Sequence, residues 1–189
     1  YTTIPAYHAS ALSLFHRGAD GLSLFNYDYV PASQRIAMAE GLKRITDVQY
    51  LKTKPKHYVV SRGFGSLPAR NQAMVDLIVP DDTAGDAFAR AVLRVETRNP
   101  CTDLTIVAQV NGMRLQACDY EGRELFAPLA DNAGYASRDT LKFYAVPLDL
   151  LVLGNNRVAI DNSDKTTKPC TFVTMELGLF HGDSCKSLS

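Results

Sequence analysis

The chain has 189 residues, of which 46% are hydrophobic and 21% are charged, so it can bury a substantial core and is not intrinsically disordered. Twenty basic residues balance twenty acidic ones, and no run of five or more like charges occurs, which argues against nucleic acid or anionic lipid as a partner. No apolar run approaches the roughly 18 residues that span a bilayer, so we expect a soluble chain.

The first sixty residues have the pattern of helix, strand, helix. Apolar residues at spacings of three and four predict a helix over 3–17, which Thr2 or Thr3 can cap. A short buried strand is expected at 21–26, and a second helix at 33–45. This order of elements is typical of a parallel α/β sheet.

The pattern changes after Thr46, through a lysine-rich link at 51–58 and a strand at 58–60, to a turn marked by glycine and proline at 62–68. From there onward, apolar and polar residues alternate in runs of strand length, separated by turn residues. Seven or eight short strands with this spacing predict an antiparallel β-sandwich. These alternating runs lie at 73–80, 89–98, 104–110, 113–118, 140–147, 156–162 and 171–180.

Two features organise these elements further. The pair Asn111 and Gly112 predicts a tight hairpin, since both residue types tolerate positive φ in a type I′ turn. We expect two parts: a helix-strand-helix segment at 1–60 and a β-sandwich at 61–189. A strand buried on both faces needs neighbours on both sides. Residues 1–60 are therefore expected to be the tail of a larger α/β domain, docked on the sandwich or on protein outside this chain.

Three stretches resemble parts of known carbohydrate-active proteins. Residues 8–29, "HASALSLFHRGADGLSLFNYDY", resemble the last helix-strand step of the (β/α)8 barrels of glycoside hydrolases. "TIVAQVNGMRLQAC" (105–118) and "YAVPLDLLVLGNNRVAID" (144–161) resemble the galactose-binding-like jelly-roll modules that follow such barrels. The resemblance implies a mainly β chain, a jelly-roll-like antiparallel β-sandwich preceded by a short α/β segment similar to the last unit of a TIM barrel.

The resemblance also implies where a barrel site would lie. Asn26, Tyr27 and Asp28 would follow the eighth strand at its carboxyl end, the face where barrel enzymes keep their sites, and could bind a sugar hydroxyl. The alternative is that Asn26 and Asp28 cap the next loop while Tyr27 packs. Glycoside hydrolysis usually needs two carboxyl groups about 5 to 10 Å apart. Only Asp28 qualifies, so the chain lacks a complete catalytic pair and whether it belongs to an enzyme stays open.

The sandwich offers two further candidate sites. Tyr120 and Tyr135 are the best candidates for stacking against a sugar ring, with a plain loop role as the alternative, and the chain has no tryptophan. Asp81, Asp82 and Asp86 could donate oxygens to a structural Ca²⁺ ion, the one cofactor that the sequence suggests. They fit no EF-hand spacing, and a solvated turn is the alternative.

The four cysteines are spaced too widely for a zinc site. Two alternatives stay open for them: free buried thiols, or one or two disulfides. Disulfides form in oxidising compartments, and we expect an extracytoplasmic or secreted protein. The cysteines are Cys101, Cys118, Cys170 and Cys185.

The expected function is that of an accessory β-sandwich region in a carbohydrate-active, glycoside hydrolase-like protein. It would support the barrel, with glycan contact as a secondary role. Its partners would be the upstream barrel domain or another protein chain, and a glycan. The alternative is a protein-interaction or assembly module without sugar binding, and a third hypothesis is a self-contained enzyme that uses Asn26, Tyr27 and Asp28.

Overall fold

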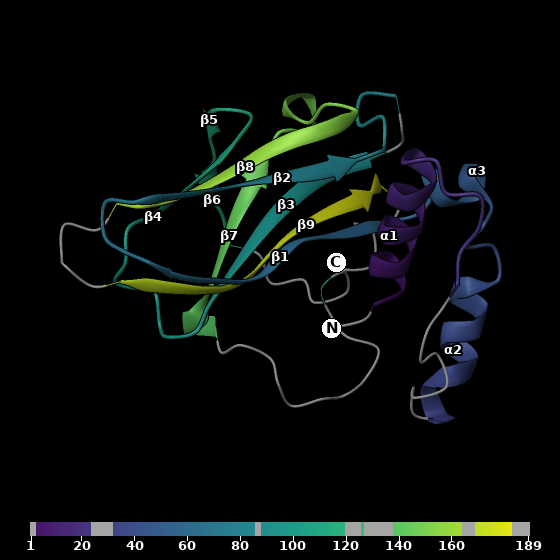
Figure 1. Cartoon of the computed structure of the whole chain (residues 1–189), viewed down its shortest axis with the longest axis horizontal. Helices are drawn as coiled ribbons and strands as arrows, with labels where there is room; N and C mark the ends of the chain where they lie inside the picture. Colours follow the sequence, from purple (N-terminus) through teal and green to yellow (C-terminus); the bar gives the residue numbers. More distant parts are fainter. Residues whose placement is uncertain are drawn as a thin grey trace.

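The computed structural model of the chain describes residues 3–23, 32–85, 88–119, 126, 138–163 and 169–182. Within these ranges it consists mainly of antiparallel strands in two sheets, with three α-helices beside them (Figure 1). The two sheets face each other, which confirms the predicted β-sandwich. None of the helices in the described ranges has the length and apolar character needed to cross a membrane.

Nine strands form the two sheets within the described residues, and all neighbouring strands are antiparallel. The five-stranded sheet has, in spatial order, β1 (Lys56–Leu67), β9 (Cys170–His181), β3 (Phe88–Thr97), β7 (Leu141–Val146) and β6 (Gln116–Ala117). The four-stranded sheet has β2 (Gln72–Val79), β8 (Gly154–Asn162), β4 (Ile106–Val110) and β5 (Met113–Arg114). Two short 3₁₀ helices, Arg138–Thr140 and Leu148–Leu150, flank β7.

The core lies between the sheets, and alternate residues of the strands fill it. In β4, Ile106 and Ala108 are buried, whereas Val107 between them is half-buried. Strand β9, which lies between β1 and β3, differs, because every residue over 174–180 is buried. Phe126 packs with Val92 of β3 and Phe180 of β9 in a second, smaller apolar cluster, so part of the five-stranded sheet is also covered outside the main core.

The hairpin predicted at Asn111 and Gly112 is present, with φ values of 50° and 82°. The run predicted as one strand over 113–118 is instead divided. β5 pairs with β4 in one sheet, whereas β6 pairs with β7 in the other. Leu115 between them is buried, and its backbone N–H donates to Ala108 at 2.9 Å. The chain bends at this point because it passes from one sheet to the other.

Helices α1 (Ile4–His16) and α2 (Ala32–Leu42) match the two predicted helices. The Thr3 hydroxyl caps α1 by accepting a hydrogen bond from the Ala6 N–H at 3.0 Å. A third helix, α3 (Val48–Lys52), lies where an irregular link was expected. Of the strand expected at 21–26, residues 21–23 have no regular structure and the rest lies outside the described residues.

The turn expected at 62–68 is wrong, since β1 continues through it to Leu67 and crosses the boundary expected after residue 60. The pairing of β1 with β9 has two irregularities, one between Val59 and Ser61, just before this stretch, and one between Arg62 and Gly65, within it. Glycine within a strand is often associated with such bulges. The glycines that suggested a turn therefore belong to a bulged edge strand.

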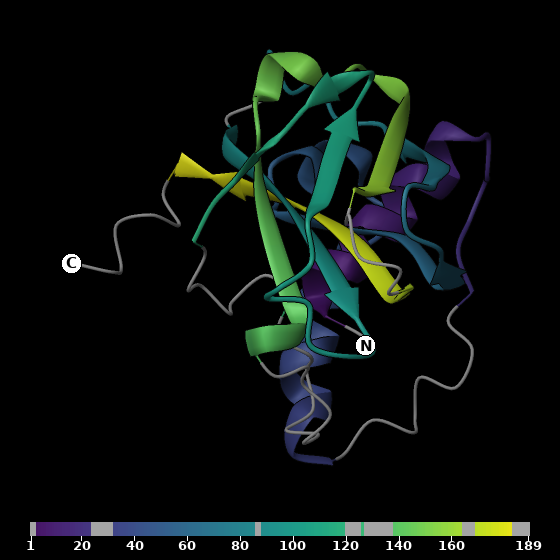
Figure 2. The ribbon, with the colours of Figure 1, turned by 90° about the vertical axis from the view of Figure 1, so that its left-hand side faces the viewer.

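The helices lie at one end of the sandwich (Figure 1). α1 runs beside β1, whereas α2 packs on α1 and extends away from both sheets (Figures 1 and 2). The contact between the two helices is close: an ideal Cβ atom at Gly41 would lie 2.5 Å from Ile4 Cδ1. The carbonyl of Gly41 also lies 2.8 Å from His8 Nε2. α2 therefore depends on α1 for its position.

Candidate functional site

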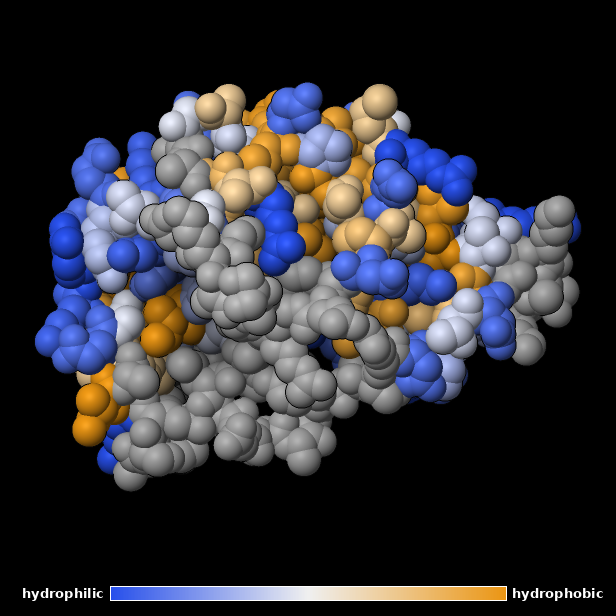
Figure 3. Space-filling model, turned by 180° about the vertical axis from the view of Figure 1, so that it is seen from behind, coloured by the Kyte–Doolittle hydropathy of each residue, from blue (hydrophilic) through white to orange (hydrophobic). Residues whose placement is uncertain are grey.

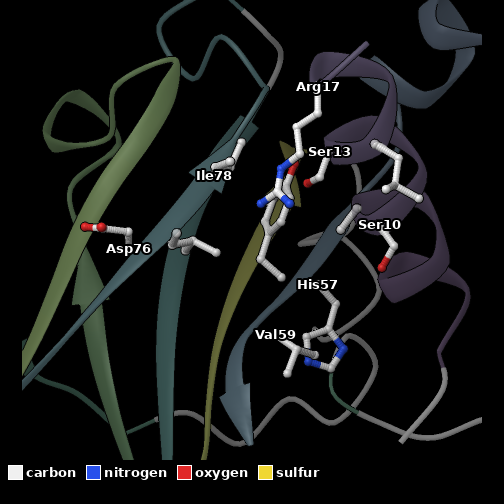
Figure 4. A pocket seen from close by; sticks show the side chains of 11 residues that line it. Ser10, Ser13, Arg17, His57, Val59, Asp76 and Ile78 are labelled. Atoms are coloured by element: carbon white, nitrogen blue, oxygen red, sulfur yellow. The ribbon is translucent and has the colours of Figure 1, made fainter. Parts of the chain in front are cut away.

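A groove of about 350 Å³ lies between α1 and the outer edges of β1 and β2. On the face of the molecule opposite to Figure 1, apolar residues are interspersed with hydrophilic ones (Figure 3). The groove is lined by Ala9, Ser10, Ser13, Leu14 and Arg17 from α1, His57, Tyr58 and Val59 from β1, and Asp76, Leu77 and Ile78 from β2 (Figure 4).

The groove exists because β1 and β2 are edge strands of different sheets. Among the described residues, each of these two strands has a neighbouring strand on one side only, and α1 lies beside the opening between them. On α1, Ser10, Ser13 and Arg17 recur at spacings of three and four, which places them on one side of the helix. Two of these side chains are small, so space is left between the helix and the strands.

Arg17 gives the groove a positive charge. Its guanidinium group and the Ser13 hydroxyl point into the space between α1 and β2, whereas Asp76 points away from it (Figure 4). The Asp76 carboxylate pairs with Arg157, whose Nε lies 3.3 Å from Oδ1. In the described part of the chain, no carboxylate pairs with Arg17.

Apolar side chains form the rest of the accessible lining. Leu14 is 45% exposed and Val59 is 36% exposed, so both present apolar surface to solvent. Ile78 is half-buried, and Leu77 and Tyr58 lie deeper. The groove thus combines a cation, hydroxyl groups and an apolar wall.

His57, which lines the groove, also belongs to a buried polar network with the cap of α1 and residues of β9 and β3. The hydroxyl of Thr3 lies 3.1 Å from His57 Nδ1, and His57 Nε2 lies 3.4 Å from Glu176 Oε1. Arg94 contacts the same Glu176 carboxylate and lies 3.9 Å from Glu96. The network therefore joins the start of α1 to β1, β9 and β3.

The two carboxyl groups of this network have pKa values shifted in opposite directions. Burial raises the pKa of Glu96, and Arg94 only partly offsets this. Burial by itself would raise the pKa of Glu176, but the hydrogen bond with His57 and the charge of Arg94 outweigh it and lower the value. Such a pair is typical of acid-base catalysis, yet both groups are buried and neither lines the groove. We interpret the network as structural.

The structure places only part of the predicted metal site. Asp81 is fully buried, accepts a hydrogen bond from Tyr58 and lies 3.3 Å from Lys56 Nζ. Asp82 is exposed, and its Oδ1 accepts hydrogen bonds from the N–H groups of Ala84 and Gly85, each at 3.2 Å. The part of the chain that is described contains no cluster of three metal-ligating side chains.

The other predicted site residues lie outside the described residues. They are Asn26, Tyr27, Asp28, Asp86, Tyr120 and Tyr135. Sequence reasoning did not identify the groove, because its three walls come from separate elements. The one local signal was the row of small and polar side chains at Ser10, Ser13 and Arg17.

Comparison with known proteins finds similarity at low identity to parts of a few solved structures. No family model and no curated protein matches it. It is similar to a beta-porphyranase of glycoside hydrolase family 86 from the human gut bacterium Bacteroides plebeius, with 19% identity and a TM-score of 0.44 over 66% of this chain and 20% of that chain. It is also similar to BuGH86wt in complex with neoagarooctaose, with 16% identity and a TM-score of 0.41 over 66% of this chain and 18% of that one. The match therefore spans about a fifth of these structures.

Proposed function

We propose that the chain is an accessory β-sandwich region of a carbohydrate-active protein that works outside the cytoplasm. Its role is to support a (β/α)8 barrel through the N-terminal helices. The proposal draws on the resemblance of residues 8–29 to the last step of such barrels. The observation that carries it is that α1 and α3 are fixed to the sandwich, whereas α2 extends from it.

Buried polar contacts provide this attachment. Thr3, at the start of α1, contacts His57 of β1. The ammonium group of Lys56 donates to the carbonyl oxygen of Leu51 in α3 and, at 2.7 Å, to that of Lys54. Because Lys56 is fully buried and also pairs with Asp81, the helices and the sandwich form one supporting unit.

The exposed side of α2 is the surface through which this unit would contact the barrel. Ile36 on this helix is 78% exposed, the highest value among the large exposed apolar residues of the described chain. An isoleucine on a helix that extends from the sandwich suits a protein interface, because burying it removes apolar surface from water.

The test requires the coding region upstream of Tyr1. We expect it to encode further strand-helix units, and we expect deletion of residues 56–189 to lower the thermal stability of the resulting protein. Ile36→Asp should also lower the thermal stability of the longer protein. Met74→Asp, at a residue of β2 that is 60% exposed, should not. An upstream region without barrel units, or equal effects of the two variants, would contradict the proposal.

The second candidate function is a protein-interaction or assembly module, which the exposure of Ile36 also favours. In that case the chain alone should form dimers or a complex in light scattering, and Ile36→Asp should dissociate them. A monomeric chain favours the barrel-supporting role.

A further inference from the structure

We propose that the groove between α1 and the edges of β1 and β2 binds an acidic sugar residue. Arg17 would hold the carboxylate or sulfate group of that residue, and Ser10 and Ser13 would bind its hydroxyl groups. This inference rests on the proposed carbohydrate-related function and assigns a ligand class to the groove.

The charge of the groove favours an anion. The planar guanidinium of arginine binds carboxylate and sulfate-type oxygens through two parallel hydrogen bonds. Arg17 reaches into the groove from the end of α1 (Figure 4). The carboxylate in the lining, that of Asp76, points away and pairs with Arg157, so it does not neutralise Arg17.

The remaining lining suits a saccharide better than an acidic peptide side chain. A sugar presents hydroxyl groups around its ring and C–H groups on its faces. Ser10 and Ser13 supply hydroxyl partners. Within the described residues β1 and β2 are edge strands, and the outer backbone groups of such strands can bind further hydroxyls. Leu14 and Val59 offer partly exposed apolar surface for the ring face.

The size of the groove limits the length of the ligand. Its volume of about 350 Å³ lies near the lower end of the range for small-molecule sites, about 300 to 1,000 Å³. A short stretch of an acidic glycan fits this space. Because Arg17 is exposed, the binding should be weak and should decrease as the salt concentration rises.

The experiment is an NMR titration of the ¹⁵N-labelled chain with four probes of matched length. These are a uronic acid oligosaccharide, a sulfated galactan oligosaccharide, a neutral galactan oligosaccharide and an acidic peptide. We expect the signals of Arg17, Ser13 and Val59 to shift with one or both charged saccharides and not with the neutral one. A response to the uronate alone identifies a carboxylate ligand, and a response to the sulfated probe alone identifies a sulfate ester.

Variants test the part played by Arg17. Arg17→Gln should weaken binding about tenfold or more, as expected for the loss of a charge-assisted hydrogen bond, and Arg17→Lys should retain part of the affinity. Arg98→Gln is the matched control, because Arg98 is an exposed arginine outside the groove. The spectrum of each free variant verifies that it is folded.

Several results would overturn the inference. They are equal binding of neutral and charged saccharides, tighter binding of the acidic peptide, unchanged affinity in Arg17→Gln, or shifts confined to residues outside the groove. Each of these outcomes contradicts only the groove proposal if deletion of residues 56–189 still destabilises the longer protein. Conversely, if the groove binds charged saccharides but the deletion has no effect on stability, the proposed function is contradicted and the groove proposal is supported.

Discussion

Lys56 and Asp81 form an ion pair in which both side chains are completely buried, with Nζ 3.3 Å from Oδ1. The two residues lie at the start of β1 and just after the end of β2. Tyr58 donates its hydroxyl hydrogen to the same carboxylate. One carboxylate therefore satisfies a cation and a hydroxyl group at the junction between the helices and the sandwich.

Asp81→Ala should destabilise the protein by about 3–5 kcal/mol, because it leaves the Lys56 charge buried without its counter-ion. The free energy of unfolding, measured by urea denaturation, checks this value. Asp82→Ala is the matched control, since this neighbouring carboxylate is exposed and its loss should cost about 1 kcal/mol or less. Similar losses of unfolding free energy in both variants would show that the buried pair contributes no more to stability than an exposed carboxylate does.

Glu176 should make the stability depend on pH in the acid range. Its pKa lies below the ordinary value of 4.5, because His57 and Arg94 outweigh the effect of burial. The stabilisation is therefore fully present above the pKa of the unfolded chain and is lost as the pH falls through the lower folded value. The free energy of unfolding, measured by urea denaturation at a series of pH values from neutral to acid, should show this loss.

Substitution separates this contribution from those of other carboxyl groups. Glu176→Gln should be less stable than the unsubstituted chain at neutral pH, and the difference should shrink as the pH falls. The Glu96→Gln variant should still lose stability as the pH falls, because burial raises the pKa of Glu96 instead of lowering it. A Glu176→Gln variant whose deficit stays constant with pH would contradict the assignment.

Elements with a regular local pattern could be predicted from the sequence. Alternation is a local property, so β2 and β8 were located to within two residues at each end. The five-residue helix α3 is too short to show a helical period, and its cap Asp47 was its only local signal. In β1, bulges and glycines interrupted the alternation.

The groove could not be predicted in the same way. Its lining comes from three elements, and only the assembled structure shows that β1 and β2 are edges of different sheets beside α1. Arg17 was interpreted as the end of a helix, which it is. Nothing within α1 indicates that the Arg17 side chain points into the space between this helix and β2 (Figure 4).

The thiols of Cys101 and Cys170 should react slowly with alkylating reagents in the folded protein. Both are free and buried, and burial, together with nearby Cys101, raises the pKa of Cys170 to about 11. Since the thiolate is the reactive form, labelling near neutral pH should require unfolding. Cys118, which is half-buried, should react first of these three. Mass spectrometry of alkylation time courses with and without urea checks this order.

A reduction step distinguishes the two alternatives that the sequence left open for these cysteines. If Cys101 and Cys170 are free, urea alone should expose both to labelling. Labelling that also requires a reductant would show that one or both take part in a disulfide, and would contradict the free thiols of the structure.

Asn156 should be essential to the turn before β8, because its fully buried side chain uses both of its polar atoms. Nδ2 donates to the carbonyl oxygens of Val152 and Gly154 at 2.8 and 3.1 Å, and Oδ1 accepts from Val152 and Asn111 at 2.9 Å. Asn156→Ala removes all four bonds and should cost about 2–3 kcal/mol. The exposed neighbour Asn155 provides the control, for which Asn155→Ala should cost about 0.5 kcal/mol or less.

Asn156→Asp tests the direction of these hydrogen bonds. At neutral pH an acceptor oxygen would face the carbonyl oxygens of Val152 and Gly154 in place of the donor, so this variant should be less stable than Asn156→Ala. Acidification should reduce the difference in unfolding free energy between the two variants, because a protonated carboxyl group donates one hydrogen bond. Denaturation of both variants at neutral and acid pH measures this difference. A difference that does not change with pH would mean that the hydrogen-bond donor to these two carbonyl groups is not what stabilises the turn.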